Sequence, residues 1–138
     1  SPGILGIIIN PFYFARLGLY KAVRRLSPHL TGHLLDVGCG VKPYQNLFKV
    51  NKYVGLDIDT LQAKNRGVAD FLYDGNHFPF EDGVFDSLLC NQVLEHVFNP
   101  NEFLDEIKRV MKKGGKLLIT VNDKIKQIFG FINKNEQS

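Results

Sequence analysis

Short apolar runs alternate with helical patterns through the centre of the chain, and this alternation constrains the fold more than any other feature. The runs predict five strands, at residues 33–37, 53–58, 68–73, 84–90 and 116–121. Helical patterns fall near residues 43–49, 61–65, 92–98 and 101–113. Strands that alternate with helices form a parallel sheet covered on both faces. The sequence therefore predicts an α/β fold with a doubly wound, Rossmann-like and mostly parallel sheet.

The N-terminal residues show a different pattern. Residues 1–10 have the composition of an apolar arm, and Pro11 suits the first turn of a helix capped by Asn10. Within residues 12–27, apolar side chains recur at spacings of three and four, while basic residues fall largely elsewhere. This predicts an amphipathic helix that packs on the domain with its basic face in solvent, or one that contacts a membrane surface.

Length and composition favour one folded unit. The 138 residues are 44% hydrophobic with a net charge of +3, which is ordinary for a globular domain and too small a surplus to imply nucleic acid. Cys39 and Cys90 belong to no metal-ligand cluster, so we expect no metal and a reduced, cytoplasmic protein. We divide the chain into an arm with a helix, a central domain and a tail, at residues 1–30, 31–122 and 123–138.

One predicted strand runs into a glycine-rich turn. Residues 34–44 read LLDVGCGVKPY, so the strand ends in an acid, Asp36, followed by Gly38 and Gly40. In a doubly wound sheet, ligands bind at the carboxyl ends of the strands, and glycines there let a ligand approach the backbone closely. The turn is therefore a candidate ligand site, although tight turns also use glycine for structural reasons alone.

Three further predicted strands end in polar or glycine residues. Asp57 ends the second strand, 19 residues after Gly38, where an acid can accept both hydroxyls of a ribose. Asp74 and Gly75 follow the third strand, where a carboxylate can accept a hydrogen bond from an adenine amino group. Asn91 follows the fourth strand. Four such strand ends at one edge of a sheet predict a nucleoside-like ligand.

Together these segments resemble the class I S-adenosylmethionine-dependent methyltransferases, of the type that acts on small molecules or lipids. The resemblance covers about residues 31–122. The matching motifs are the acid and glycines of Asp36–Gly40, the acid in VGLDID, the segment DGNHFPF, the pair Phe85-Asp86 followed by Asn91 and VLEHV, and the turn Arg109–Gly115 before the fifth strand.

The resemblance implies S-adenosylmethionine as the cofactor and assigns its binding to particular residues. For the methionine part these are Asp36, Gly38, Cys39, Gly40 and Asn91. For the ribose and adenine they are Asp57, Ile58, Asp74 and Gly75.

Methyl transfer is an in-line displacement at a sulfonium carbon, in which the protein mostly positions the nucleophile and excludes water. A general base is needed only where the acceptor keeps its proton at neutral pH. The candidate catalytic bases are His96, Glu95 and His77, and His96, which follows the fourth strand, is preferred. The alternative is that His96 packs against or caps its helical segment. The acceptor implied is a small molecule, a lipid or a lipid-linked glycan, and no nucleic acid is expected.

The sequence also raises alternatives to an active methyltransferase. A nicotinamide dehydrogenase needs a glycine three positions after Gly40, where this chain has Pro43. Related methyltransferases continue past the fifth strand, so we expect a truncated enzyme, or a cofactor-binding or assembly module without catalysis. The open edge of the fifth strand is expected to be covered by the tail or by a second subunit, which would form a homodimer.

Overall fold

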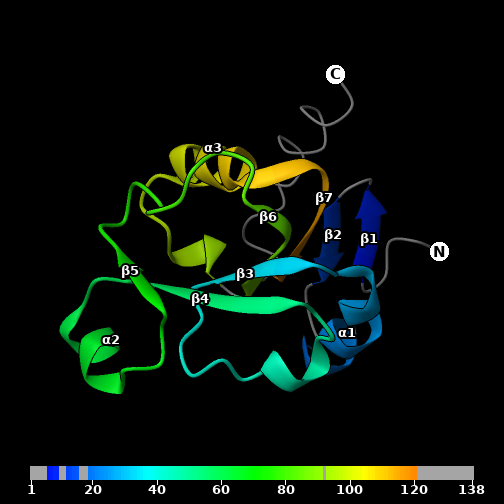
Figure 1. Ribbon diagram of the computed structural model, residues 1–138, viewed down its shortest axis with the longest axis horizontal. Helices are drawn as coiled ribbons and strands as arrows, with labels where there is room; N and C mark the ends of the chain where they lie inside the picture. The colour runs from blue at the N-terminus through cyan, green and yellow to red at the C-terminus, as the bar shows by residue number, and fades with distance from the viewer. Residues whose placement is uncertain (1–5, 10–11, 16–18, 92, 121–138) are drawn as a thin grey trace.

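The computed structural model describes residues 6–9, 12–15, 19–91 and 93–120. Within these residues, seven strands form one sheet in the order β1-β2-β7-β6-β3-β4-β5 (Figure 1). The strands are β1 Gly6–Ile9, β2 Phe12–Ala15, β3 His33–Val37, β4 Lys52–Ile58, β5 Phe71–Tyr73, β6 Phe85–Asn91 and β7 Met111–Thr120. All neighbours are parallel except β1 and β2, which confirms the mostly parallel sheet.

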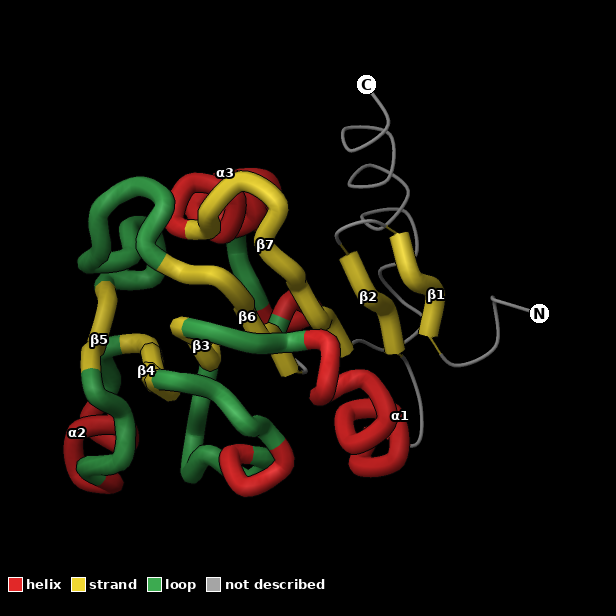
Figure 2. Tube along the Cα trace, turned by 45° about the vertical axis from the view of Figure 1, so that its right-hand side comes forward, coloured by secondary structure: helices red, strands yellow, loops and turns green. Residues whose placement is uncertain are grey.

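Helices cover both faces of this sheet. They are α1 Leu19–Leu26, α2 Leu61–Arg66 and α3 Pro100–Val110, with 3₁₀ turns at Ser27–His29, Gln45–Leu47 and Leu94–His96. α3 lies over one face, whereas α1 and the turn at Gln45–Leu47 lie on the other (Figure 2). The predicted doubly wound arrangement is therefore confirmed. Among the residues that the structure describes, no helix is long and apolar enough to cross a bilayer.

Alternation along the strands divides the core between the two faces. Leu35 and Val37 of β3 pack in one cluster with Ile107 of α3. Leu34, on the opposite face of the same strand, packs instead with Val23 of α1. Successive side chains of a strand point to opposite faces, and all of these are apolar because both faces are covered.

The N-terminal segments add two strands in place of an arm and a long helix. β1 pairs with β2, and β2 pairs with β7, with Phe12 opposite Leu117. The described helix begins at Leu19, so the prediction is wrong for residues 6–9 and 12–15. Asn10 and Pro11 lie outside the described residues. The two segments, GIII and FYFA, are rich in β-branched and aromatic residues, which favour strands. Runs of four residues are too short for their periodicity to decide.

This hairpin occupies the sheet edge that was expected to be open. The fifth predicted strand corresponds to β7, which pairs with β6 on one side and with β2 on the other. The expected cover by the tail or a second subunit, and the homodimer that followed from it, are therefore wrong, because β2 already uses these backbone groups. The tail at residues 123–138 lies outside the described residues.

Three predicted helices are shorter in the structure. The helical pattern at residues 43–49 becomes the 3₁₀ turn at Gln45–Leu47. The helical pattern at residues 92–98 becomes a single 3₁₀ turn at Leu94–His96. α3 ends at Val110, and the chain enters β7 directly at Met111. Gly114 follows at φ +82°, an angle that glycine adopts far more readily than other residues.

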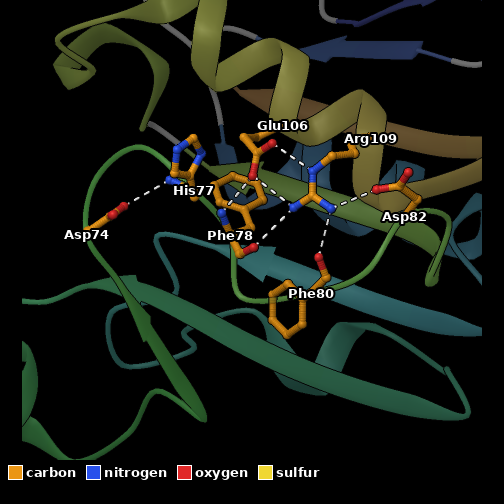
Figure 3. Close-up of polar contacts among 7 residues, drawn as sticks. All are labelled: Asp74, His77, Phe78, Phe80, Asp82, Glu106 and Arg109. Atoms are coloured by element: carbon orange, nitrogen blue, oxygen red, sulfur yellow. Dashed lines mark hydrogen bonds and ion pairs between the residues drawn. The ribbon is translucent and has the colours of Figure 1, made fainter.

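One arginine attaches the loop between β5 and β6 to α3 (Figure 3). Nε and Nη2 of Arg109 donate to the two carboxylate oxygens of Glu106 at 2.7 and 2.9 Å. Nη1 donates to the Phe80 carbonyl at 2.8 Å and to the Asp82 carboxylate at 2.9 Å. Nη2 also donates to the Phe78 carbonyl at 3.1 Å, while the Phe78 amide donates to Glu106 at 2.7 Å. The planar guanidinium thus donates hydrogen bonds in several directions at once, and these bonds attach the loop to α3.

Replacing Arg109 by lysine keeps the charge but removes the planar set of donors. We expect Arg109→Lys to lower the free energy of unfolding by about 1–2 kcal/mol, because several hydrogen bonds to the loop are lost together. Urea denaturation followed by circular dichroism measures this change. Lys108→Arg, at the exposed neighbouring position, is the control and should leave the midpoint unchanged. Equal midpoints for the two variants would show that Arg109 does not hold the loop.

Candidate functional site

Two adjoining cavities open at the carboxyl ends of the parallel strands. The larger, of about 590 Å³, lies among the ends of β4 and β5 and residues 93–99. The smaller, of about 240 Å³, lies beside the ends of β3 and β6 and the segment that contains residues 41–44. Gly38 and Gly40 line both cavities, so the glycine turn separates them.

Every predicted cofactor residue, and the preferred base His96, lines at least one of these cavities, whereas His77 lines neither. The smaller is lined by Asp36, Cys39 and Asn91, the larger by Asp57, Ile58, Asp74, Gly75 and His96, and both by Gly38 and Gly40. The fold thus brings together residues from strand ends that are far apart in the chain.

β4 holds the backbone of the glycine turn. The amides of Gly38 and Cys39 donate to the Leu56 carbonyl at 2.7 and 3.1 Å. Gly38 and Gly40 have φ angles of +72° and +51°, in the left-handed region that favours glycine. A Cβ at Gly38 would overlap the Val93 side chain, whereas nothing lies within 4 Å of a Cβ at Gly40. Position 38 therefore favours glycine both for its positive φ angle and because Val93 leaves no room for a Cβ, whereas position 40 favours glycine for its φ angle alone.

Asp36 is a buried acid at the smaller cavity, with 2% of its surface exposed. The Tyr53 hydroxyl donates to its Oδ2 at 2.6 Å. Burial raises the pKa of Asp36 to about 7, although the hydrogen bond from Tyr53 and the charge of Lys42 act in the opposite direction. A carboxyl group that titrates near neutrality beside a cavity suits a cationic ligand group, whose charge would favour the carboxylate.

Asp57 is oriented by two donors. Its Oδ1 accepts a hydrogen bond from the Ile58 amide at 2.9 Å, and its Oδ2 lies 3.2 Å from Nη1 of Arg66. Arg66 also lines the larger cavity, and the sequence reasoning missed it. The available signal was a basic residue in the last turn of the helix that follows the acid.

Asp74 forms a tight turn with the residues that follow it. Its Oδ1 accepts hydrogen bonds from the amides of Asn76 at 2.8 Å and His77 at 2.9 Å, the second of which is drawn in Figure 3. The His77 and Asn76 amides hold the pKa of Asp74 below its usual value. Gly75 has φ +98°, and a Cβ there would lie 3.5 Å from Cδ1 of Ile58. Ile58 and Gly75 therefore lie close together on the wall of the larger cavity.

The smaller cavity also contains an amide and a thiol. Oδ1 of Asn91 accepts a hydrogen bond from the Thr120 hydroxyl, which orients the amide. Cys39 and Cys90 are both buried, and neither forms a disulfide. Burial, and then the charges of Asp36 and other nearby acids, raise the pKa of Cys39 to about 12. The Cys39 thiol therefore stays protonated at neutral pH and is no nucleophile.

His96 is exposed on the larger cavity beside an apolar rim. The rim consists of Val93, Val97 and Phe98, and Phe98 is 96% exposed. In a continuous helix over residues 92–98, Val93, His96 and Val97 would share one face, and only Phe98 would lie away from it. In the structure this segment forms the short turn at Leu94–His96, and Phe98 also lines the cavity.

Comparison with known proteins gives a consistent result. Residues 35–119 match a family model described as a methyltransferase domain. An uncharacterised protein of Methanocaldococcus jannaschii is 35% identical over 111 residues, which cover 77% of this chain and 53% of that protein. The crystal structure of a putative methyltransferase from Bacillus halodurans matches with a TM-score of 0.60 and 26% identity, over 85% of this chain and 58% of that one.

Two relatives with more specific names differ in their acceptors. A mitochondrial ubiquinone biosynthesis O-methyltransferase of Dictyostelium discoideum is 26% identical over 67% of this chain and 36% of its own length. A tRNA (carboxymethyluridine(34)-5-O)-methyltransferase of Arabidopsis thaliana is 31% identical over 64% of this chain and 23% of its own length. The chain thus spans about half, or less, of the length of the curated relatives that it matches.

The two glycines of the turn make a matched pair of variants. We expect Gly38→Ala to lower the free energy of unfolding by about 2 kcal/mol or more, because the new methyl group meets Val93 in a strained backbone. Gly40→Ala adds only the backbone strain and should cost about 1 kcal/mol. Chemical denaturation of both variants measures the difference. If Gly38→Ala were as stable as Gly40→Ala, the close approach of Val93 to the turn would be wrong.

Proposed function

From the chain's membership of the class I S-adenosylmethionine-dependent methyltransferases, we propose its function. It binds S-adenosylmethionine in the two adjoining cavities and transfers the methyl group to an acceptor. S-adenosylmethionine is the methyl donor of this family. The observation that carries the proposal is the gathering of every predicted cofactor residue around these cavities. The proposed cofactor-binding domain remains residues 31–122, which contain the matched family region.

The smaller cavity is proposed to hold the methionine part of the cofactor. Asp36 receives its positively charged amino group, because Asp36 is the buried acid of that cavity. Gly38, Cys39 and Gly40 allow close approach to the backbone. The Asn91 amide, oriented by Thr120, lines the crevice beside them.

The larger cavity is proposed to hold the ribose and adenine. Asp57 accepts hydrogen bonds from the ribose hydroxyls, and its contact with Arg66 holds the carboxylate in place. Ile58 packs on the adenine ring. Asp74, oriented by two backbone amides, accepts a hydrogen bond from the adenine amino group, and the Gly75 amide assists.

The protein's part in the reaction is mainly one of position. S-adenosylmethionine, when bound, supplies the electrophilic methyl carbon and its own leaving group. The residues around the cavities place the acceptor in line and exclude water. His96, exposed on the larger cavity, is the proposed base that takes the acceptor's proton where the acceptor still has one.

We assign the acceptor to the small molecules, lipids and lipid-linked glycans. The apolar rim of Val93, Val97 and Phe98 beside His96 suits such an acceptor. The relative named for ubiquinone biosynthesis is consistent with this class. The relative named for tRNA makes nucleic acid the competing class, so an acceptor screen has to include both.

α1 is proposed to contact a membrane surface in the cytoplasm. Its exposed side chains include the basic residues Lys21, Arg24 and Arg25. Basic residues on the exposed face of an amphipathic helix attract anionic lipid headgroups. Sedimentation with anionic and with neutral vesicles tests this contact, and equal binding to both would contradict it.

A second candidate function is a cofactor-binding or assembly module without catalysis. The residues proposed to hold the cofactor line the two cavities under either function, so cofactor binding alone does not separate the two. Methyl transfer by this chain, measured beside a longer form of the protein against a panel of acceptors, separates the two functions. Cofactor binding without turnover in this chain, together with turnover in the longer form, would favour the module.

Calorimetric titration with S-adenosylmethionine tests the shared premise. Asp57→Asn is expected to weaken binding about tenfold, because the ribose loses a charged acceptor and Arg66 loses its partner. Asp59→Asn is the matched control, since Asp59 pairs at 3.3 Å with the exposed Lys64 and lines neither cavity. No binding by the wild-type chain at millimolar ligand, or equal affinity in the two variants, would overturn the assignment.

The titration of Asp36 predicts how this affinity depends on pH. With its pKa at about 7 in the ligand-free protein, Asp36 must lose a proton before it can pair with a cationic group. Below pH 7, affinity is therefore expected to increase about tenfold for each increase of one pH unit, and above pH 7 it is expected to level off. Asp36→Asn should remove this dependence. A wild-type affinity that is constant between pH 5.5 and pH 7 would show that Asp36 does not meet the ligand's charge.

A further inference from the structure

In the turn after β3, every second residue from position 38 to position 42 has a left-handed backbone conformation. Gly38, Gly40 and Lys42 have φ angles of +72°, +51° and +55°. Glycine adopts such angles freely, whereas the Cβ of an L residue then approaches the following carbonyl oxygen. Over the described ranges, Lys42 is the only non-glycine residue with a positive φ. Its surroundings must therefore hold it in this conformation.

The far end of the Lys42 side chain is fixed. Its Nζ lies 2.8 Å from Oδ2 of Asp70, the residue before β5, and only 13% of the lysine side chain is exposed. The same carboxylate oxygen accepts a hydrogen bond from the Gly55 amide of β4 at 2.7 Å. The ion pair thus attaches the turn to two neighbouring strands at once.

Gly55 leaves room for the aliphatic part of this lysine. A Cβ at position 55 would lie 2.5 Å from Cε of Lys42 and 2.8 Å from Sγ of Cys39. The lysine therefore crosses β4 at a residue without a side chain. The left-handed backbone at Lys42 and the glycine at position 55 of β4 together accommodate the Lys42 side chain.

Asp70 is ionised where it meets the lysine. Burial opposes its ionisation, but the hydrogen bonds from Lys42 and from the Gly55 amide outweigh that effect, so the pKa of Asp70 lies below its usual value. A carboxylate with an ammonium group and a backbone amide as donors forms charge-assisted hydrogen bonds, which are stronger than neutral ones.

Lys42 acts on the cavities only through the turn. It lines neither cavity, whereas its neighbours Val41 and Pro43 line the smaller one. Its amide donates to the Cys39 carbonyl at 2.7 Å, which closes the turn around Gly40. A change at Lys42 therefore reaches a ligand by moving this backbone.

We propose that the Lys42–Asp70 ion pair holds Lys42 in its left-handed backbone conformation, which Gly38 and Gly40 adopt without such help because they lack a Cβ. Lys42 is thereby a positioning residue for S-adenosylmethionine. The proposal rests on the proposed cofactor function. It implies that a glycine at position 42 no longer needs the ion pair.

Calorimetric titration with S-adenosylmethionine separates the charge from the backbone. Lys42→Met keeps the aliphatic stem, and Asp70→Asn keeps an acceptor for the Gly55 amide, yet each is expected to weaken binding about tenfold. Lys42→Gly is expected to stay within about twofold of the wild type, because glycine adopts the angle without strain. Asp70→Asn in the Lys42→Gly background is expected to have little further effect. In turnover assays, the loss falls on KM for S-adenosylmethionine and leaves kcat unchanged.

Lys112→Met is the matched control. It removes an exposed ion pair, 3.3 Å from Asp86, at the opposite ends of the strands, and it should bind the cofactor as the wild type does. Wild-type affinity in Lys42→Met would overturn the proposal. So would a Lys42→Gly variant as weak as Lys42→Met, because the side chain would then act on the ligand in another way.

Hydrogen exchange in the ligand-free protein distinguishes failure of this proposal from failure of the cofactor function. The amides of Gly38, Cys39 and Lys42 are expected to exchange faster in Lys42→Met than in the wild type or Lys112→Met. If the wild type binds no S-adenosylmethionine but these amides do exchange faster, the cofactor function is wrong and the ion pair still holds the turn. If their exchange is unchanged, the ion pair does not hold the turn and the proposal is overturned.

Discussion

The parallel pairing of β3 with β4 on one side and with β6 on the other is the constraint on which the rest of the structure depends. Its register sets Val37 opposite both Leu56 and Cys90, so the three strands end at nearly the same level. The glycine turn and the polar residues at the ends of β4 and β6 meet at one edge for this reason. The two cavities are the space between these strand ends and the segments that leave them.

Three carboxylates at that edge are held in different electrostatic states by their neighbours. Asp36 is buried and titrates near neutrality, Asp57 pairs with an arginine, and the exposed Asp74 is stabilised as an anion by backbone amides. Each state suits a different part of one ligand: a cation, a pair of hydroxyls and an amino group. One edge of a sheet can therefore recognise chemically distinct groups with a single residue type.

The sequence predicted what depends on local signals and missed what depends on pairing between distant segments. The strand at His33–Val37 and the glycine turn follow from a run of adjacent residues, and the structure has that strand with the predicted bounds. The pairing of β2 with β7, and the contact between Tyr53 and Asp36, require knowledge of which strands are neighbours. Arg66 is a different case, because it lies only nine residues after Asp57 and its position in the last turn of the next helix was a local signal that the reasoning did not use.

The pairing of Phe12 with Leu117 joins the first and last parts of the chain that the structure describes. During synthesis β2 leaves the ribosome exit tunnel long before β7 is made. The N-terminal hairpin therefore cannot pair with β7 until most of the described sheet has been synthesised. Contacts of such long sequence separation form late and slow the folding of a domain. The hairpin can therefore pair with its neighbour only after β7 has been synthesised, which makes this contact a late step in the assembly of the described sheet.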